Sequence, residues 1–241
     1  MLCVLFIQTS HAQESERSAD FWGLGFAYGV DFSAGDMADR YGQHSHASLS
    51  FDLFKNKFNG ILRLEASLSF GSNVKEDVLS IYRAENGALL GNDGQYVDVF
   101  LRQRGSYLGV LAEKIILSKK DNKRAGLSLG LGLGLMQHNI RFQVDSSNAP
   151  QLEGDYAKGY DRNSIGPAIK QNISYLHLGK NKSLNYQISL FFTEAFTQNN
   201  RSINFDTMAA EEGRRLDIVI GLEARWIIPF KDQQKAEEIF Y

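Results

Sequence analysis

The sequence lacks several features that would point to common classes of protein. Among its 241 residues the one cysteine, Cys3, lies in an apolar N-terminal run, so the rest of the chain has no disulfide framework and no cysteine metal site. The net charge of −2 excludes a chain-wide basic footprint for nucleic acid. No apolar run approaches the length of about 18 residues that a transmembrane helix needs. The scarcity of proline, three in all, suits a strand-rich chain, because proline interrupts strand pairing.

The first residues resemble a secretory signal. Residues 2–7 are apolar, and Ser10, His11 and Ala12 form a small-x-small cleavage site, although the usual basic segment before the apolar run is missing. We therefore expect residues 1–12 to be a signal peptide. An exported chain without a membrane helix is soluble, surface-attached or a membrane barrel.

Large and small residues alternate along much of the chain, which is the pattern of β-strands. In residues 22–32, WGLGFAYGVDF, the large apolar residues are separated by glycine, alanine or aspartate, and residues 127–135 repeat this with leucine and glycine. Such runs predict eight strands, at 21–33, 46–54, 61–71, 96–117, 127–144, 161–178, 184–196 and 216–230. The connections alternate between long and short, and no linker divides residues 13–230, so we expect one domain.

Two local irregularities give more specific predictions. The apolar parity changes after Leu135, since Ile140, Phe142 and Val144 are even-numbered, and this predicts a β-bulge near 136–139. Residues 74–82 carry apolar residues at helical spacing and predict a short helix. The alternative is a strand extension in which 78–83 pairs with 95–104.

The nature of the small face decides which side of the strands meets lipid. A water-exposed face normally carries long polar side chains, whereas glycine, alanine and serine suit a crowded interior. We therefore predict an all-β, eight-stranded antiparallel up-and-down transmembrane β-barrel with its apolar face in lipid. The lipid-facing residues would be Trp22, Leu24, Phe26, Leu127, Leu129, Leu131, Leu133, Ile218, Ile220, Leu222 and Trp226. Aromatic girdles are expected at Trp22, Tyr175, Tyr186, Trp226 and Phe230 near the short turns, and at Phe32, Phe70, Tyr107, Phe142 and Phe196 near the long loops.

Charges of both signs fall on the small, inward face. An eight-stranded barrel is just wide enough for side chains to fill it, so these charges must pair with one another. The expected interior network consists of Asp52, Arg63, Glu65, Lys170, Asp217, Glu223 and Arg225. The alternative is a narrow channel or proton path.

Residues 21–230 resemble the small outer-membrane barrels of the OmpA/OmpX kind, and the glycine-alternating strands and the ending GLEARWIIPF resemble barrels of Bacteroidota. The resemblance implies a bacterial outer-membrane location. Residues 231–241 depart from a barrel that stops at its last strand, and we expect them to form a periplasmic tail. The leading expectation is a non-enzymatic structural or accessory function, with outer-membrane lipid and other envelope proteins as partners. The resemblance adds components associated with type IX secretion to these expected partners. A barrel of this kind needs no cofactor.

Catalytic and metal sites find little support in the sequence. His44 and His46 would point the same way on a strand, but no third metal ligand is evident. A lipid-modifying enzyme would need a pair such as His46 with Ser48 or His138 with Ser128. The first pair faces inward, and the second is too far apart along one strand. We therefore predict no catalytic or metal residue, and expect contacts with partners at the loops 72–95, 145–160 and 197–213 or at the tail. A soluble ligand-binding barrel remains a third alternative.

Overall fold

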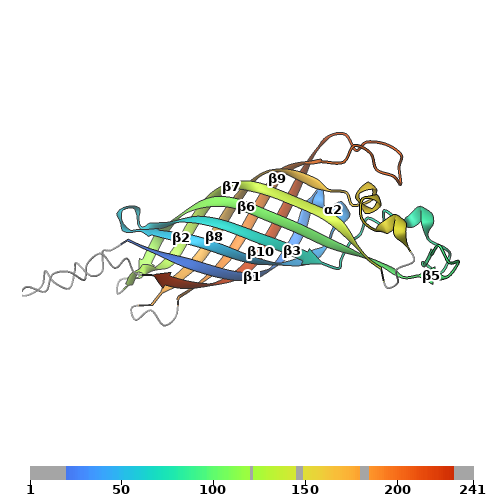
Figure 1. Cartoon of the computed structure of the whole chain (residues 1–241). Helices are drawn as coiled ribbons and strands as arrows, with labels where there is room; N and C mark the ends of the chain where they lie inside the picture. The colour runs from blue at the N-terminus through green and yellow to red at the C-terminus, as the bar shows by residue number, and fades with distance from the viewer. Residues whose placement is uncertain (1–19, 120–121, 145–148, 180–184, 231–241) are drawn as a thin grey trace, which may run out of the picture.

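Eight long strands pair antiparallel with their neighbours, and the last strand pairs with the first. The computed structural model describes residues 20–119, 122–144, 149–179 and 185–230. The strands form a closed barrel in the order β1-β10-β9-β8-β7-β6-β3-β2 (Figure 1). They are β1 (Phe21–Gly35), β2 (Gln43–Lys55), β3 (Gly60–Gly71), β6 (Val99–Lys119), β7 (Asn122–Val144), β8 (Ser164–Leu178), β9 (Asn185–Asn199) and β10 (Arg214–Phe230).

The pairing of β1 with β10 closes the ring and removes its edges. It runs from Trp22 opposite Phe230 to Gly35 opposite Asp217. Every long strand therefore has a partner on both sides, which a strand in lipid requires because no water is present to bond its backbone. None of the helices in the described part of the chain is long and apolar enough to cross a bilayer.

The connections at the two ends of the barrel differ in length, as the alternation predicted. One end has the connections 56–59, with the 3₁₀ turn η1 (Asn56–Phe58), 120–121 and 179–184. The other end carries the connections 36–42, 72–98, 145–163 and 200–213. Their short elements are α2 (Met37–Arg40), η2 (Ser80–Tyr82), β4 (Leu89–Leu90), β5 (Tyr96–Val97), η3 (Pro150–Leu152) and η4 (Tyr156–Gly159). We call these the short-turn end and the long-loop end.

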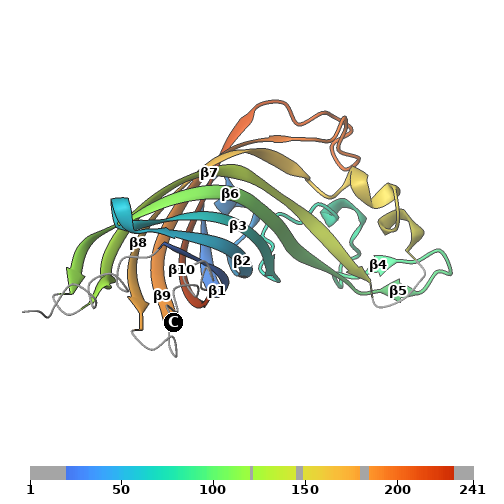
Figure 2. The same ribbon diagram turned by 60° about the vertical axis from the view of Figure 1, so that its left-hand side comes forward.

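Strands β6 and β7, of 21 and 23 residues, are longer than the others. Their pairing continues to Val99 opposite Val144, whereas the partner of β6 on the other side, β3, ends at Gly71 opposite Gln103. The two strands thus leave the barrel as a two-stranded ribbon that reaches the loops (Figure 2).

The predicted bulge near 136–139 is wrong. The pairing of β7 with β6 is regular through this segment, and the irregularities lie between Ile115 and Leu117 and between Ser118 and Lys119. Residues 140, 142 and 144 point to the same side as Gly132, and Ile140 packs against the loops there. The parity changes because the strand leaves the apolar band, so that its inner face becomes apolar and its outer face becomes polar.

The predicted helix at 74–82 and two of the predicted girdle residues, Tyr107 and Phe142, are also wrong for related reasons. Residues 74–82 form neither the predicted helix nor the alternative strand extension, but a loop with the single 3₁₀ turn η2. Their apolar residues Val78 and Leu79 are buried in the loop cluster rather than along a helix face. Tyr107 and Phe142 do not belong to an outer girdle, because both pack against this inner cluster.

The barrel interior is apolar at both ends and polar between them. At the short-turn end Phe54, Ile61, Ile115, Leu176, Leu178 and Ile227 form one buried cluster. At the long-loop end a second cluster joins the inner face of the barrel to the loops, through residues such as Met37, Tyr41 and Leu79. The predicted signal peptide 1–12 and tail 231–241 lie outside the described residues.

Candidate functional site

Arg63 lies at the centre of the first group of buried charges, which spans the barrel just above the apolar cluster of the short-turn end. Its Nε donates to Oδ1 of Asp52 at 2.6 Å, and its Nη2 donates to Oε1 of Gln187 at 2.7 Å. Its Nη1 lies 3.5 Å from Oε2 of Glu113, which also accepts a hydrogen bond from the Gln187 amide. Because β3 and β9 are on opposite sides of the ring, this group bridges the whole cross-section.

The second group lies further toward the long-loop end and is built around Glu65. Its two carboxylate oxygens accept from Lys170 Nζ at 2.6 Å and from Arg225 Nη2 at 2.7 Å. Arg225 also contacts Glu223 at 2.9 Å and donates to the Ser50 hydroxyl. The predicted interior charges are thus all buried, and all but Asp217 belong to these two groups.

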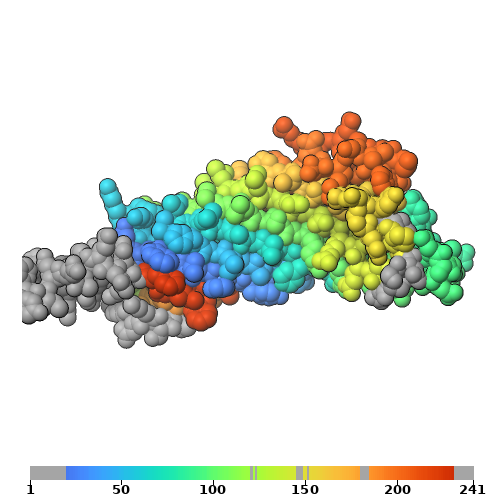
Figure 3. Space-filling view, viewed as in Figure 1, coloured from blue at the N-terminus to red at the C-terminus, as the bar shows by residue number. Residues whose placement is uncertain are grey.

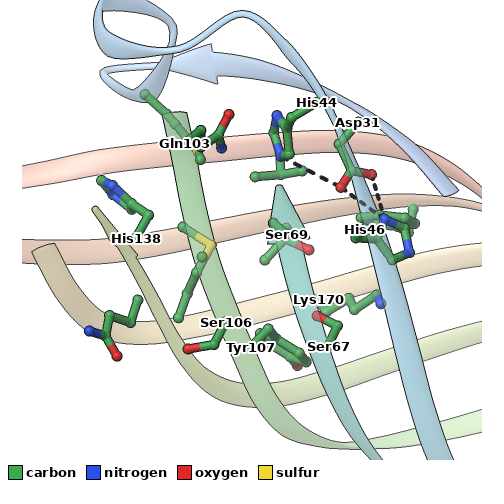
Figure 4. A pocket seen from close by; sticks show the side chains of 17 residues that line it. Asp31, His44, His46, Ser67, Ser69, Gln103, Ser106, Tyr107, His138 and Lys170 are labelled. Atoms are coloured by element: carbon green, nitrogen blue, oxygen red, sulfur yellow. Dashed lines mark hydrogen bonds and ion pairs between the residues drawn. The ribbon is translucent and has the colours of Figure 1, made fainter. Parts of the chain in front are cut away.

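His44 and His46 point to the same side of β2, where they meet carboxylates. Nδ1 of His46 lies 2.8 Å from Asp31, and Nε2 of His44 lies 3.5 Å from the same carboxylate (Figure 4). Nε2 of His46 lies 3.1 Å from Glu223. Among the residues that the structure describes, no three His, Cys, Asp or Glu side chains are grouped as a metal site. The two imidazoles therefore extend the network of the second group.

A small cavity of about 40 Å³ lies beside these histidines. It is lined by Gln103, Tyr107 and His138 among others, which point into the same space in Figure 4. The amide atoms of Gln103 and the hydroxyl of Tyr107 have no hydrogen-bond partner in the described part of the chain. The volume is enough for a few water molecules and too small for an organic ligand.

Asp217 lies apart from the two groups, under the loops. Its Oδ2 lies 2.9 Å from Nε2 of His138 and accepts a hydrogen bond from the Thr197 hydroxyl. Nδ1 of His138 lies 3.3 Å from the Tyr41 hydroxyl. His138 and Thr197 both contact the Asp217 carboxylate and do not contact each other. The Thr197 hydroxyl is therefore not a nucleophile with His138 as its base.

The pairs considered for lipid modification are also separated. Ser48 accepts a hydrogen bond from Arg225, and Ser128 donates to Glu113, so neither hydroxyl is bonded to a histidine. His46 and His138 are both buried. In the described residues, therefore, neither of the two pairs considered has the geometry of a catalytic site.

Some buried charged residues were missed from the sequence. Asp31 and Glu113 lie on the same inward face as the predicted charges and could have been found by the same parity. Arg40 could not, because it lies in the short helix α2 and its partners are 36 and 171 residues away.

Ion pairs join the four connections of the long-loop end into one assembly. Arg40 contacts Glu76 at 2.8 Å and also pairs with Glu211, which links the connections 36–42, 72–98 and 200–213. Arg162 contacts the same Glu76 at 2.8 Å and Asp206 at 2.5 Å. Burial opposes ionisation of Asp206, but its hydrogen bonds with Arg162 and the charge of Arg162 outweigh this and lower the pKa of Asp206.

Aromatic contacts reinforce the same assembly. Tyr160 packs edge-on against Tyr82 and Phe205, which come from the two neighbouring loops. Burial, together with a hydrogen bond with Tyr82, raises the pKa of Tyr160 to about 12. The loops gather at one end of the molecule in the space-filling view, where the segments in green, yellow and orange adjoin (Figure 3).

The outer surface of the barrel indicates the environment of the protein. Of the predicted lipid-facing residues, Leu127 and Ile218 are half-buried and the other nine are exposed, among them Leu131 at 59%. Leucine, isoleucine and aromatic side chains continue around the neighbouring strands. A closed barrel with charges inside and a wide apolar exterior is stable only in a membrane.

The protein is a small outer-membrane β-barrel. An even number of antiparallel strands, short turns at one end and long loops at the other are the architecture of bacterial outer-membrane barrels. In this architecture the short-turn end faces the periplasm and the long-loop end faces the outside of the cell.

Comparison with known proteins finds distantly similar solved structures. No family model and no curated protein matches the sequence. Among solved structures, Neisserial surface protein A is 11% identical with a TM-score of 0.42, over 88% of this chain and 99% of that chain. The Yersinia pestis protein Ail, solved with a heparin analogue, is 10% identical with a TM-score of 0.39, over 88% and 99%. The outer membrane protein OprG of Pseudomonas aeruginosa is 12% identical with a TM-score of 0.38, over 90% and 98%.

Proposed function

We propose that this outer-membrane barrel is a non-enzymatic accessory protein whose external loop assembly binds another envelope protein. The observation that carries the proposal is a set of exposed apolar side chains on loops that are joined to one another by partly buried ion pairs. Exposed residues of this kind that lie outside the lipid-facing band mark contact surfaces for proteins. The components associated with type IX secretion that the sequence resemblance implies are one class of partner to test.

The apolar residues are concentrated on the hairpin of β4 and β5 and on the loops beside it. Leu90 and Tyr96 are opposite each other in the hairpin and are 60% and 63% exposed. Tyr156 and Met208, on the next two loops, are 67% and 74% exposed. Tyrosine and methionine are common at protein interfaces, where their large side chains fill pockets of the partner.

The barrel interior supports a function at the surface rather than within. Two groups of paired charges and an apolar cluster occupy the lumen, and the cavity on the long-loop side of the second group holds no more than a few water molecules. These contacts favour neither the narrow channel nor the lipid-modifying enzyme.

The test is purification from native envelopes in a mild detergent, with an affinity tag after Tyr241. The wild-type barrel is expected to bring one partner in a fixed ratio, measured by quantitative mass spectrometry. A variant with Leu90→Ser and Tyr96→Ser should lose that partner, because it removes apolar contact area without touching the ion pairs. The control Glu212→Ser changes an exposed position of another loop and should retain the partner.

Two results would refute the proposal. One is a barrel that is recovered without any partner. The other is a partner that remains equally bound to the variant with the altered hairpin, which would place the contact elsewhere.

A further inference from the structure

Three arginines lie together on the outer face of the β6–β7 ribbon. Arg102 is directly opposite Arg141 in the strand pairing, and Arg104 is two residues further along β6. Their side chains share the outward side with Leu108 and Leu135, because positions of the same parity on a strand point the same way. We call these three residues the arginine patch.

Among the residues that the structure describes, the arginine patch differs from the loop arginines in having no acidic partner. Arg40, Arg83, Arg162 and Arg201 each pair with a carboxylate. In the described part of the chain, no carboxylate forms an ion pair with any of the three patch residues.

Within the described residues, the groups near the patch arginines are neutral groups and the charges of the other patch arginines. Arg102 donates to the Gln143 side chain at 3.0 Å, and Arg104 donates to the backbone oxygen of Gln103. The charges of Arg102 and Arg141 both act on Arg104. An anion bound among the three would relieve this repulsion.

The height of the patch on the barrel indicates which anion it meets. Arg104 is opposite Phe70 of β3, which was predicted for the outer aromatic girdle and is exposed on the outside of the barrel. Four residues separate Arg104 from the lipid-facing Leu108, about 14 Å along a strand and less along the normal of the membrane because the strands are tilted. The patch thus lies at the level of the lipid headgroups on the long-loop side.

We propose that Arg102, Arg104 and Arg141 bind the phosphorylated headgroup of a lipid of the outer leaflet. Arginine forms two parallel hydrogen bonds with a phosphate and keeps its charge in all conditions, so three arginines on one face suit a phosphorylated sugar headgroup. The acyl chains of the same lipid would lie on Leu108 and Leu135 below the patch. A soluble phosphate compound would leave these two leucines uncovered.

The experiment measures binding of lipid A to the detergent-solubilised barrel by native mass spectrometry. Diphosphorylated lipid A is expected to bind, and its Kd should rise about tenfold or more when all three arginines are changed to glutamine, because basic side chains at a membrane surface act additively. The matched control changes the exposed Lys55, Lys57 and Lys114 of the short-turn end to glutamine, which removes the same charge. This control should keep the wild-type affinity.

Two further arms identify the source of the phosphate. Lipid A without phosphates should bind the wild type as weakly as the diphosphorylated lipid binds the arginine variant. Inorganic phosphate at the concentration of the lipid should not displace it. Equal binding by the wild type and the arginine variant would overturn the proposal, and displacement by inorganic phosphate would assign the patch to small anions instead of lipid. Electrophoresis of unheated samples shows that each variant is folded.

Discussion

Arg63 illustrates how a charged side chain is kept inside a membrane barrel. It is 2% exposed, and two carboxylates and an amide oxygen surround its guanidinium. Taking an ion pair out of water is costly, so the group is tolerated only because nearly every donor finds an acceptor. The same pairing leaves Asp52 and Glu113 dependent on the arginine.

Replacement of Arg63 by methionine should therefore destabilise the barrel by about 3–5 kcal/mol, because it leaves two buried carboxylates without their cation. The free energy of unfolding is measured by urea titration in detergent micelles. The matched double variant Asp52→Asn with Arg63→Met should recover part of the loss. A single variant as stable as the wild type would mean that water or a rearranged neighbour replaces the arginine.

At the scale of the strand, the alternation of side chains sets both faces at once. In β7 the odd-numbered leucines lie on the outer face of the barrel. The glycines that alternate with them lie on the inner face, where they leave room for interior side chains. A Cβ atom built on Gly134 would lie 2.7 Å from the ring of Tyr107 and 2.6 Å from the backbone oxygen of Leu108. The small residues that looked unusual in the sequence are thus required by close approach inside the barrel.

Leu131→Arg tests which face of β7 meets lipid. An arginine near the middle of the apolar band should cost about 2–4 kcal/mol, because the charge must leave water. The control Gln143→Arg lies on the same face of the same strand but beyond the band, and it should cost little. Folding into phospholipid vesicles, followed by electrophoresis of unheated samples, gives both values. Equal tolerance of the two variants would show that Leu131 faces water.

The sequence predicted the elements well where the apolar band dictates a strict alternation. The ends of the eight predicted strands agree with the structure to within a few residues, as for β1 and β9. The predictions of a bulge near 136–139 and of a helix at 74–82 were wrong because the apolar residues of these segments pack against loops that are distant in the sequence. Ile140 and Val78, for example, belong to one cluster formed by several connections. Contacts of this range leave no periodic signal in a single sequence.

For the whole molecule, the two ends of the lumen are closed in different ways. The short-turn end has an apolar cluster that includes Ile61 and Ile227, and the long-loop end has the ion-paired loops over a second cluster. The two charge groups lie between these closures. Ion-paired loops above a filled barrel leave the outer surface as the place where the protein meets lipid.

This closure predicts that the barrel does not conduct ions. The wild-type protein in a planar bilayer should give no steady single-channel current, because paired charges and apolar side chains fill a lumen that eight strands make narrow. A wide porin in the same bilayer serves as the positive control. A stepwise current that scales with salt concentration would contradict the prediction. It would mean that the Arg63 and Glu65 groups separate in the membrane, and that the small cavity beside His46 is part of a continuous path.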